Sequence, residues 1–290
     1  MRQEDPASFL WLDLSDAPEQ IAARLRKGTI TAEEAGLLRH WSEHGYAIIP
    51  GVIPAHLIAA ALAEVDEVWN KRRHVSIDVL TDGSRTFVDK LDPSARKVPH
   101  KLNDLYLISD NARRIFLNEK IVRFAELVFG QAAIGCNSLT FEFGSQQPAH
   151  IDHVYMTPVH ARRLIASWIA LEDVRPEAGP LLLWPGSHRV APYDFGGGRY
   201  HYKPELESNN TAYIAEQKER FAQSRFMARK GDVLLWHSFF IHGGGLIENP
   251  AATRRSMACH YYGRDSIPGD PPLIRDGSAW YVSKPIEDPV

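Results

Sequence analysis

The chain has 290 residues, 44% of them hydrophobic, which is enough for one sizeable core and fits a single domain. Its formal net charge of −3 gives no electrostatic reason to expect a nucleic acid or an anionic membrane as a partner. No apolar run approaches the roughly 18 residues of a membrane span, and the first residues do not form a signal peptide. We therefore expect a cytoplasmic protein, with Cys136 and Cys259 as free, buried thiols.

Helices are predicted in the N-terminal part of the chain. Thr31 has the form of a helix cap and opens an amphipathic helix that Gly45 ends. A short strand is expected over 46–49, and Pro54 opens a second helix with its apolar residues on one face. A third helix is expected over 119–129, where a glycine follows.

The C-terminal half has the pattern of a β-protein. From residue 133 to 262 short apolar runs alternate with glycine and proline turns, which is typical of a sandwich or a barrel. A polar segment with two turn signals occupies 73–101. A second polar segment, from about 192 to 224, interrupts the strands. We expect it to be either a lid over a site or a solvated surface helix.

The most informative feature is the motif His150-Ile151-Asp152, with His242 about ninety residues later. If residues 149–155 form a strand, His150 and Asp152 point to the same face of the sheet. Two histidines and one carboxylate are the ligands of the facial triad that binds non-haem Fe(II) and leaves coordination positions open. The motif therefore predicts an iron site.

His242 is a better third ligand than His237. The two histidines are five positions apart, an odd number, so in an unbroken strand only one of them faces the site. Three glycines, Gly243 to Gly245, follow His242 and are expected to leave room for small molecules beside the metal.

Further motifs occur in the order in which one known family has them. They are Trp41–Gly51, Gly144-Ser145-x-Gln147-x-x-His150-x-Asp152, Trp168–Val174, Ala178-Gly179-Pro180-Leu181, Pro185-Gly186-Ser187-His188, and His242-Gly243-Gly244 with Arg254. Over about residues 30–262 the chain resembles the phytanoyl-CoA dioxygenase family of Fe(II)/2-oxoglutarate-dependent oxygenases. The resemblance implies a mainly β fold with flanking helices around a double-stranded β-helix, that is, a cupin-like jelly roll.

The expected organisation is one dioxygenase domain over 1–290. It comprises a helical N-terminal part at about 1–130, a jelly-roll core at about 131–265 and the lid-like insertion at about 192–224. We assign no chemistry to the turn at 185–188.

The resemblance also implies a co-substrate site. Fe(II) is implied to react with 2-oxoglutarate and O2, and Arg254 to bind a 2-oxoglutarate carboxylate through its planar guanidinium. The neighbouring Arg255 faces the other way if both lie on a strand. Further candidates for contacts with the co-substrate are Trp168, Asn137 and Lys101. The family often has a hydroxyl residue at the position of Gly244, which leaves one hydrogen bond to the co-substrate in question.

The expected function is hydroxylation of an unactivated carbon of a small organic substrate, with release of succinate and CO2. Desaturation, ring formation or halogenation at the same iron is one alternative, and a jelly-roll binding protein without turnover is another. The complete ligand set argues against the binding protein. The sequence does not identify the oligomeric state or the substrate, which we expect to be a specialised metabolite, a sugar or an acyl derivative.

Overall fold

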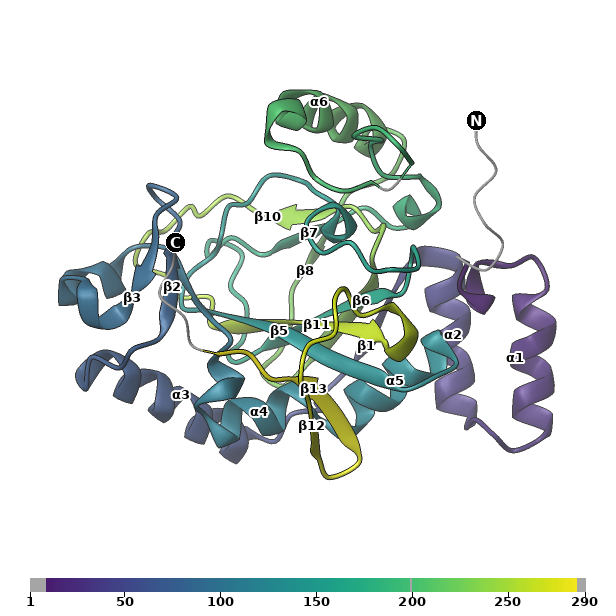
Figure 1. Ribbon diagram of the computed structural model, residues 1–290, viewed down its shortest axis with the longest axis horizontal. Coiled ribbons are helices and arrows are strands. Elements are labelled where there is room, and N and C mark those ends of the chain that lie inside the picture. Colours follow the sequence, from purple (N-terminus) through teal and green to yellow (C-terminus); the bar gives the residue numbers. More distant parts are fainter. Residues whose placement is uncertain (1–8, 199, 286–290) are drawn as a thin grey trace.

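Two β-sheets face each other in the centre of the computed structural model, which describes residues 9–198 and 200–285 (Figure 1). The large sheet has the strand order β1-β9-β6-β11-β5-β4-β2-β3, with β13 joined to β5 and β12 to β13. The small sheet has the order β10-β7-β8. The strands are β1 Tyr46–Ile49, β2 Ser76–Val79, β3 Arg85–Phe87, β4 His100–Asn103, β5 Ala133–Phe141, β6 Leu164–Ala170, β7 Leu181–Leu183, β8 Ser224–Phe226, β9 Val233–His237, β10 His242–Gly244, β11 Ser256–Gly263, β12 Leu273–Asp276 and β13 Ala279–Val282.

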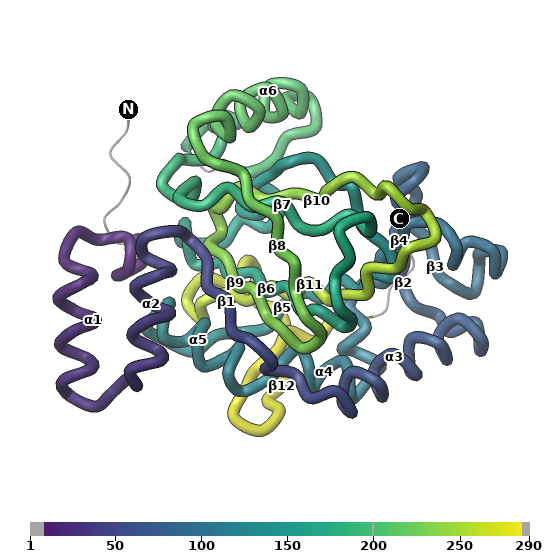
Figure 2. The backbone as a smooth tube through the Cα atoms, turned by 180° about the vertical axis from the view of Figure 1, so that it is seen from behind, coloured from purple at the N-terminus to yellow at the C-terminus, as the bar shows by residue number. Residues whose placement is uncertain are grey.

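Helices cover the outer face of the large sheet. Helices α3, α4 and α5 lie along this face, α1 and α2 stand side by side at one edge, and α6 lies beyond the small sheet (Figure 1, Figure 2). Their bounds are α1 Ala17–Arg26, α2 Ala32–His44, α3 Ala55–Asn70, α4 Asp110–Phe116, α5 Glu119–Phe129 and α6 Glu207–Lys218. None of the helices in the described ranges is long and apolar enough to cross a membrane.

The three predicted helices are confirmed, with the expected ends. Thr31 caps α2 in a capping box with Glu34, and Gly45 ends it in the left-handed conformation at φ 80°. Gly130 ends α5 in the same way, at φ 69°. Helices α1 and α4 were not predicted.

The pleat of the large sheet separates two cores. On β11, Met257 and Cys259 face outward and pack with the helices. Ala258, between them, faces the small sheet and packs with Trp168 and Phe141. The interior between the two sheets is therefore lined by one parity of each strand, as the expected jelly roll requires.

One local prediction was wrong. Residues 149–155 do not form a strand: His150 makes a single bridge to His242, and Asp152–Val154 is a turn of 3-10 helix.

The polar segment over 73–101, for which no strand was predicted, supplies β2, β3 and the start of β4. These strands extend the large sheet beyond the barrel.

The insertion over 192–224 contains α6. Ile214 of this helix packs with Trp184 and Ile241 on the outside of the small sheet. The helix is therefore attached to the barrel by an apolar contact.

Candidate metal centre and cavity

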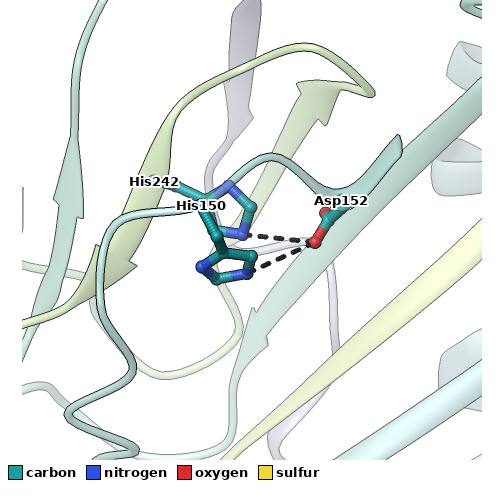
Figure 3. A group of neighbouring side chains, drawn as sticks. All are labelled: His150, Asp152 and His242. Carbon is teal, nitrogen blue, oxygen red and sulfur yellow. Dashed lines mark ion pairs between the residues drawn. The ribbon is translucent and has the colours of Figure 1, made fainter. Parts of the chain in front are cut away.

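His150, Asp152 and His242 come together at the open end of the barrel (Figure 3). Each offers one ligand atom, and these atoms lie within 4.8 Å of one another. The Nε2 atoms of His150 and His242 are 3.5 Å and 3.6 Å from Asp152 Oδ1. The spacing suits a single metal ion.

A backbone bridge and a tight turn produce this convergence. His150 N donates to His242 O over 2.9 Å, and His242 N donates to His150 O over 3.1 Å. The paired backbones place the two imidazoles side by side, with ring centroids 4.3 Å apart. The 3-10 turn then directs Asp152 at both rings. The sequence analysis predicted that His150 and Asp152 share one face of a strand. They meet instead because of the backbone bridge and the 3-10 turn.

Hydrogen bonds fix which nitrogen of each histidine can bind a metal. His150 Nδ1 lies 2.9 Å from Pro148 O, and His242 Nδ1 lies 3.1 Å from Phe240 O. A carbonyl oxygen only accepts, so both Nδ1 atoms donate. In neutral imidazoles the Nε2 lone pairs then face the site and can bind a metal ion, which at His150 would replace the contact from Gln147 Nε2 at 3.3 Å.

The protonation states also suit a divalent cation. Burial alone would raise the pKa of the Asp152 carboxyl. The neighbouring His242, His150 and His260 have the larger combined effect and hold this pKa well below the ordinary range. Burial lowers the pKa of His242 to about 4, against the opposing charge of Asp152. At neutral pH the pair is a carboxylate and a neutral imidazole, the forms that bind a metal.

Two of the three candidate ligands, His150 and Asp152, line a cavity of about 670 Å³. Its wall beyond the barrel is the sheet extension formed by β2, β3 and β4, and its lining includes residues from the end of the chain. The lining residues are His74, Val75, Ser76, Arg85, Phe87, Lys101, Asn103, Asp104, Leu107, Ile108, Asn137, Leu139, Gln147, His150, Asp152, Tyr155, Met156, His260, Lys284 and Pro285. The volume is in the usual range for a small-molecule site.

Ion pairs line the outer part of this wall. Asp78 lies between two cations on neighbouring strands. It accepts a hydrogen bond from Arg85 Nε over 2.7 Å, and Lys101 Nζ lies 3.2 Å from its carboxylate. Asp104 accepts a hydrogen bond from Lys284 Nζ over 2.8 Å. Sequence reasoning did not single out Arg85, Asp104 or Lys284. Arg85 and Asp78 face each other across the β2–β3 hairpin, which was not predicted, and Asp104 and Lys284 are 180 positions apart.

A chain of polar contacts joins the wall to the metal ligands. Asn137 Nδ2 donates to Asp104 over 3.1 Å, and Asn137 Oδ1 lies 3.1 Å from His260 Nδ1. His260 Nε2 is 3.5 Å from Asp152 Oδ2. His260, a third histidine beside the ligands, was also missed by the sequence analysis.

The structure divides the predicted co-substrate residues between two places. Lys101 and Asn137 line the cavity, whereas Arg254 and Trp168 do not. The Arg254 guanidinium lies over the ring of Trp168, with Cζ 5.4 Å from its centroid, in the interior between the sheets.

Arg254 is buried without an anionic partner among the described residues. Its side chain is 1% exposed, Nη1 donates to Gly179 O over 2.9 Å, and Nε has no partner. Burial lowers the pKa of Arg254 to about 10, so it stays charged at neutral pH. Arg255 points outward and pairs with Glu142 at 3.3 Å. The two arginines therefore face opposite sides, in the register that the sequence analysis favoured.

The glycines after His242 are required for backbone packing, and they do not leave the room that was expected. A Cβ on Gly244 would lie 2.7 Å from the nitrogen of Gln146, and one on Gly245 would lie 2.7 Å from the oxygen of Pro180. Residues 145–149 occupy this space. The backbone of a neighbouring turn packs directly against these glycines.

The insertion approaches the cavity at one point. Tyr202 N donates to Val154 O over 2.8 Å, and its ring lies 5.1 Å from that of Tyr155 between centroids. Tyr155 lines the cavity, but none of the described residues of 192–224 does so.

Comparisons with known proteins agree with this geometry. A profile described as phytanoyl-CoA dioxygenase matches residues 41–256. The peroxisomal phytanoyl-CoA dioxygenase of Homo sapiens is 22% identical over 271 residues, covering 90% of this chain and 76% of the relative.

Solved structures show the same fold. The non-haem alpha-ketoglutarate-dependent carbocyclase SnoK from nogalamycin biosynthesis superposes with a TM-score of 0.64 at 20% identity, covering 82% of this chain and 86% of the other. The epimerase SnoN, in complex with Fe3+, alpha-ketoglutarate and nogalamycin RO, has a TM-score of 0.63 at 19% identity, with coverages of 87% and 98%.

Proposed function

The chain belongs to the phytanoyl-CoA dioxygenase family, and we propose that it is an Fe(II)- and 2-oxoglutarate-dependent dioxygenase that hydroxylates an unactivated carbon of a small organic substrate. The proposal rests on two features inside the same barrel, each of which lacks a binding partner. One is a set of three metal ligands that opens into a cavity. The other is a buried arginine that lacks an anion.

His150, Asp152 and His242 would hold the iron. Their three donor atoms lie on one side, which leaves the remaining coordination positions for the co-substrate and dioxygen. When bound, the iron would activate dioxygen, which oxidises 2-oxoglutarate to succinate and CO2 with one of its oxygen atoms and passes the other to the substrate. The protein contributes binding, orientation and exclusion of water.

Arg254 would bind the distal carboxylate of 2-oxoglutarate. A buried, unpaired guanidinium is unfavourable, so the site favours a ligand that brings a carboxylate to it. Steps of two along β11 lead from the cavity residue His260 through Ala258 to Ser256, and one further step reaches Arg254, just before the strand. Ala258 retains 8% exposure although it lies between the sheets, which shows space beside it.

Three further residues would complete the co-substrate site. Trp168 would cover one side of the distal carboxylate, since its ring already lies beside Arg254. Lys101 and Asn137 would make polar contacts at the end nearer the metal, since both line the cavity. Gly244 contributes no hydroxyl.

The cavity would hold the substrate. Its apolar lining near the ligands would exclude water from the reacting carbon, and its polar wall would orient the molecule. A specialised metabolite, a sugar or an acyl derivative is the proposed substrate class. We also propose a cytoplasmic location, because Cys136 and Cys259 are both unpaired and buried, as expected in a reducing compartment.

The proposal is tested with the Fe(II)-loaded enzyme, 2-oxoglutarate and 18O-labelled dioxygen. A panel of candidate substrates is screened by succinate release, and the products of hits are analysed by mass spectrometry. Hydroxylation adds one labelled oxygen atom. Loss of two hydrogens would support desaturation or ring formation instead, and a protein that binds iron but never converts 2-oxoglutarate would be the non-catalytic alternative.

A further inference from the structure

We propose that the substrate carries a single carboxylate, which binds at the outer part of the cavity between Arg85 and Lys284. This inference rests on the proposed function, because it concerns the substrate of the same site. It narrows the substrate class to a small organic monoanion with an apolar body. The argument comes from the charges around the cavity and from where its apolar residues lie.

The charges of the described residues around the cavity do not balance once the site is filled. Three cations, Arg85, Lys101 and Lys284, line the cavity with two carboxylates, Asp104 and Asp152. Asp78, outside the lining, pairs with both Arg85 and Lys101. Fe(II) would add two positive charges and 2-oxoglutarate two negative ones, so filling the metal site leaves the lining with one cation more than carboxylates. Uncompensated charge in a partly desolvated cavity is unfavourable, and one substrate carboxylate would cancel it.

Arg85 is the cation best placed to accept a second anion. Its Nε and Nη2 donate hydrogen bonds to Asp78, whereas its Nη1 makes no hydrogen bond to the described residues. Asp78 is shared with Lys101, so one carboxylate serves two cations. The side chain of Arg85 is 62% exposed, and that of Asp78 is 13% exposed. A ligand at the outer end of the cavity can therefore reach Arg85 without displacing its partner.

Lys284 stands at the same end of the cavity. Arg85 and Lys284 both line the cavity, and the carboxylate partner of Lys284 is Asp104. Asp104 is already occupied by Asn137 and by the backbone nitrogen of Ser138. These contacts hold the carboxylate back against β5, and Lys284, 36% exposed, remains accessible from the cavity.

The rest of the cavity suits an apolar molecule. The apolar residues Leu107, Leu139 and Met156 lie in its lining together with two of the proposed metal ligands, His150 and Asp152. Tyr155 adds a ring that is 46% exposed. A carboxylate anchored at the outer cations would therefore place an apolar body along these residues, toward the ligands.

The test uses 4-phenylbutyrate and its neutral counterpart 4-phenylbutyramide as probes. Binding of each is measured by isothermal titration to the anaerobic Fe(II) enzyme saturated with 2-oxoglutarate, whose visible charge-transfer band is recorded first. The acid is expected to bind about tenfold more tightly than the amide or better, as for a charge-assisted contact. Arg85→Gln and Lys284→Gln should each remove most of this preference, and Arg85→Glu should reverse it.

The matched control is Arg175→Gln, which removes an arginine that is also paired with a carboxylate, Glu177, but lies outside the cavity. It should keep the preference of the wild-type protein. Equal binding of acid and amide to the wild-type complex would overturn the inference, as would an unchanged preference in both glutamine variants. Displacement of the acid by added 2-oxoglutarate would also overturn it, by placing the probe at Arg254. Absence of the charge-transfer band would count against the proposed function itself.

Discussion

Trp236 donates its indole N–H to Asp152 Oδ2 over 2.8 Å, and this bond leaves Oδ1 as the oxygen that faces both histidine ligands. The Trp236 ring also lies 4.5 Å from that of His242 between centroids. One side chain from β9 therefore orients two of the three metal ligands. Partners of this kind set the direction and basicity of a ligand.

Trp236→Phe should weaken metal binding by roughly ten- to a hundredfold, the usual effect of losing a hydrogen bond to a metal ligand. The phenyl ring keeps much of the packing but cannot donate. Co(II) affinity and the visible Co(II) spectrum provide the measurement. Trp69→Phe is the control, since the indole nitrogen of Trp69 is buried without a partner. Equal Co(II) affinities in the two variants would show that the hydrogen bond is not needed.

Arg254→Met should abolish the stabilisation of the protein by 2-oxoglutarate. The loss of a charge-assisted contact is worth on the order of 2–4 kcal/mol. The ligand-free variant should be at least as stable as the wild type, because an unpaired buried charge is removed. Thermal unfolding with and without 2-oxoglutarate measures both effects. Arg255→Met, on the outer face, should keep the ligand-induced rise in Tm; a rise of the same size in Arg254→Met would contradict the assignment.

Gly244→Ala should destabilise the protein by about 1–3 kcal/mol, as overpacking usually does. The new Cβ would meet backbone nitrogen of Gln146 at 2.7 Å, and backbone cannot move aside cheaply. Gly36→Ala is the control: it lies inside α2 with nothing within 4 Å, so alanine should stabilise by roughly 0.5–1 kcal/mol. Urea denaturation gives both free energies of unfolding. A neutral Gly244→Ala would mean that space is open beside His242.

Acid should destabilise the protein partly through His188. Burial, and then the charge of His237, lowers the pKa of His188 from its ordinary 6.5 to about 3. The unfolded chain therefore takes up this proton as the pH falls below 6.5 while the folded chain does not. Stability is lost across that window, by up to about 1.4 kcal/mol per pH unit for one proton.

His188→Gln should flatten this dependence between pH 6 and 4, whatever its effect on stability at neutral pH. The measurement is the free energy of unfolding in urea at several pH values. His56→Gln, at an exposed position, should leave the slope as it is in the wild type. Identical slopes in the wild type and in His188→Gln would show that His188 takes no part.

The sequence was most informative where the physics is local. A capping box and terminal glycines marked α2 and α5, because capping involves residues only a few positions apart. His237 does face away from the site, on the helical side of β9 and 3.6 Å from Asp13, but the parity argument assumed one unbroken strand, whereas His237 ends β9 and His242 begins β10 in the other sheet.

Longer-range features were not predictable in this way. The parity argument for His150 and Asp152 assumed a strand, but the chain turns after a single bridge. Asp104 and Lys284, 180 positions apart, meet only because β13 docks beside β5. Alternation within one segment does not reveal such docking, so the outer wall of the cavity could not be foreseen.

The central claim is tested most directly by anaerobic addition of Fe(II) and 2-oxoglutarate to the purified protein. One equivalent of Fe(II) should bind per chain, and 2-oxoglutarate should then produce the weak visible charge-transfer band of a chelated keto acid on open-site iron. The band should be absent in His150→Ala and in His242→Ala, and present in His237→Ala. A wild-type protein without the band, or a band of unchanged strength in either ligand variant, would contradict the account.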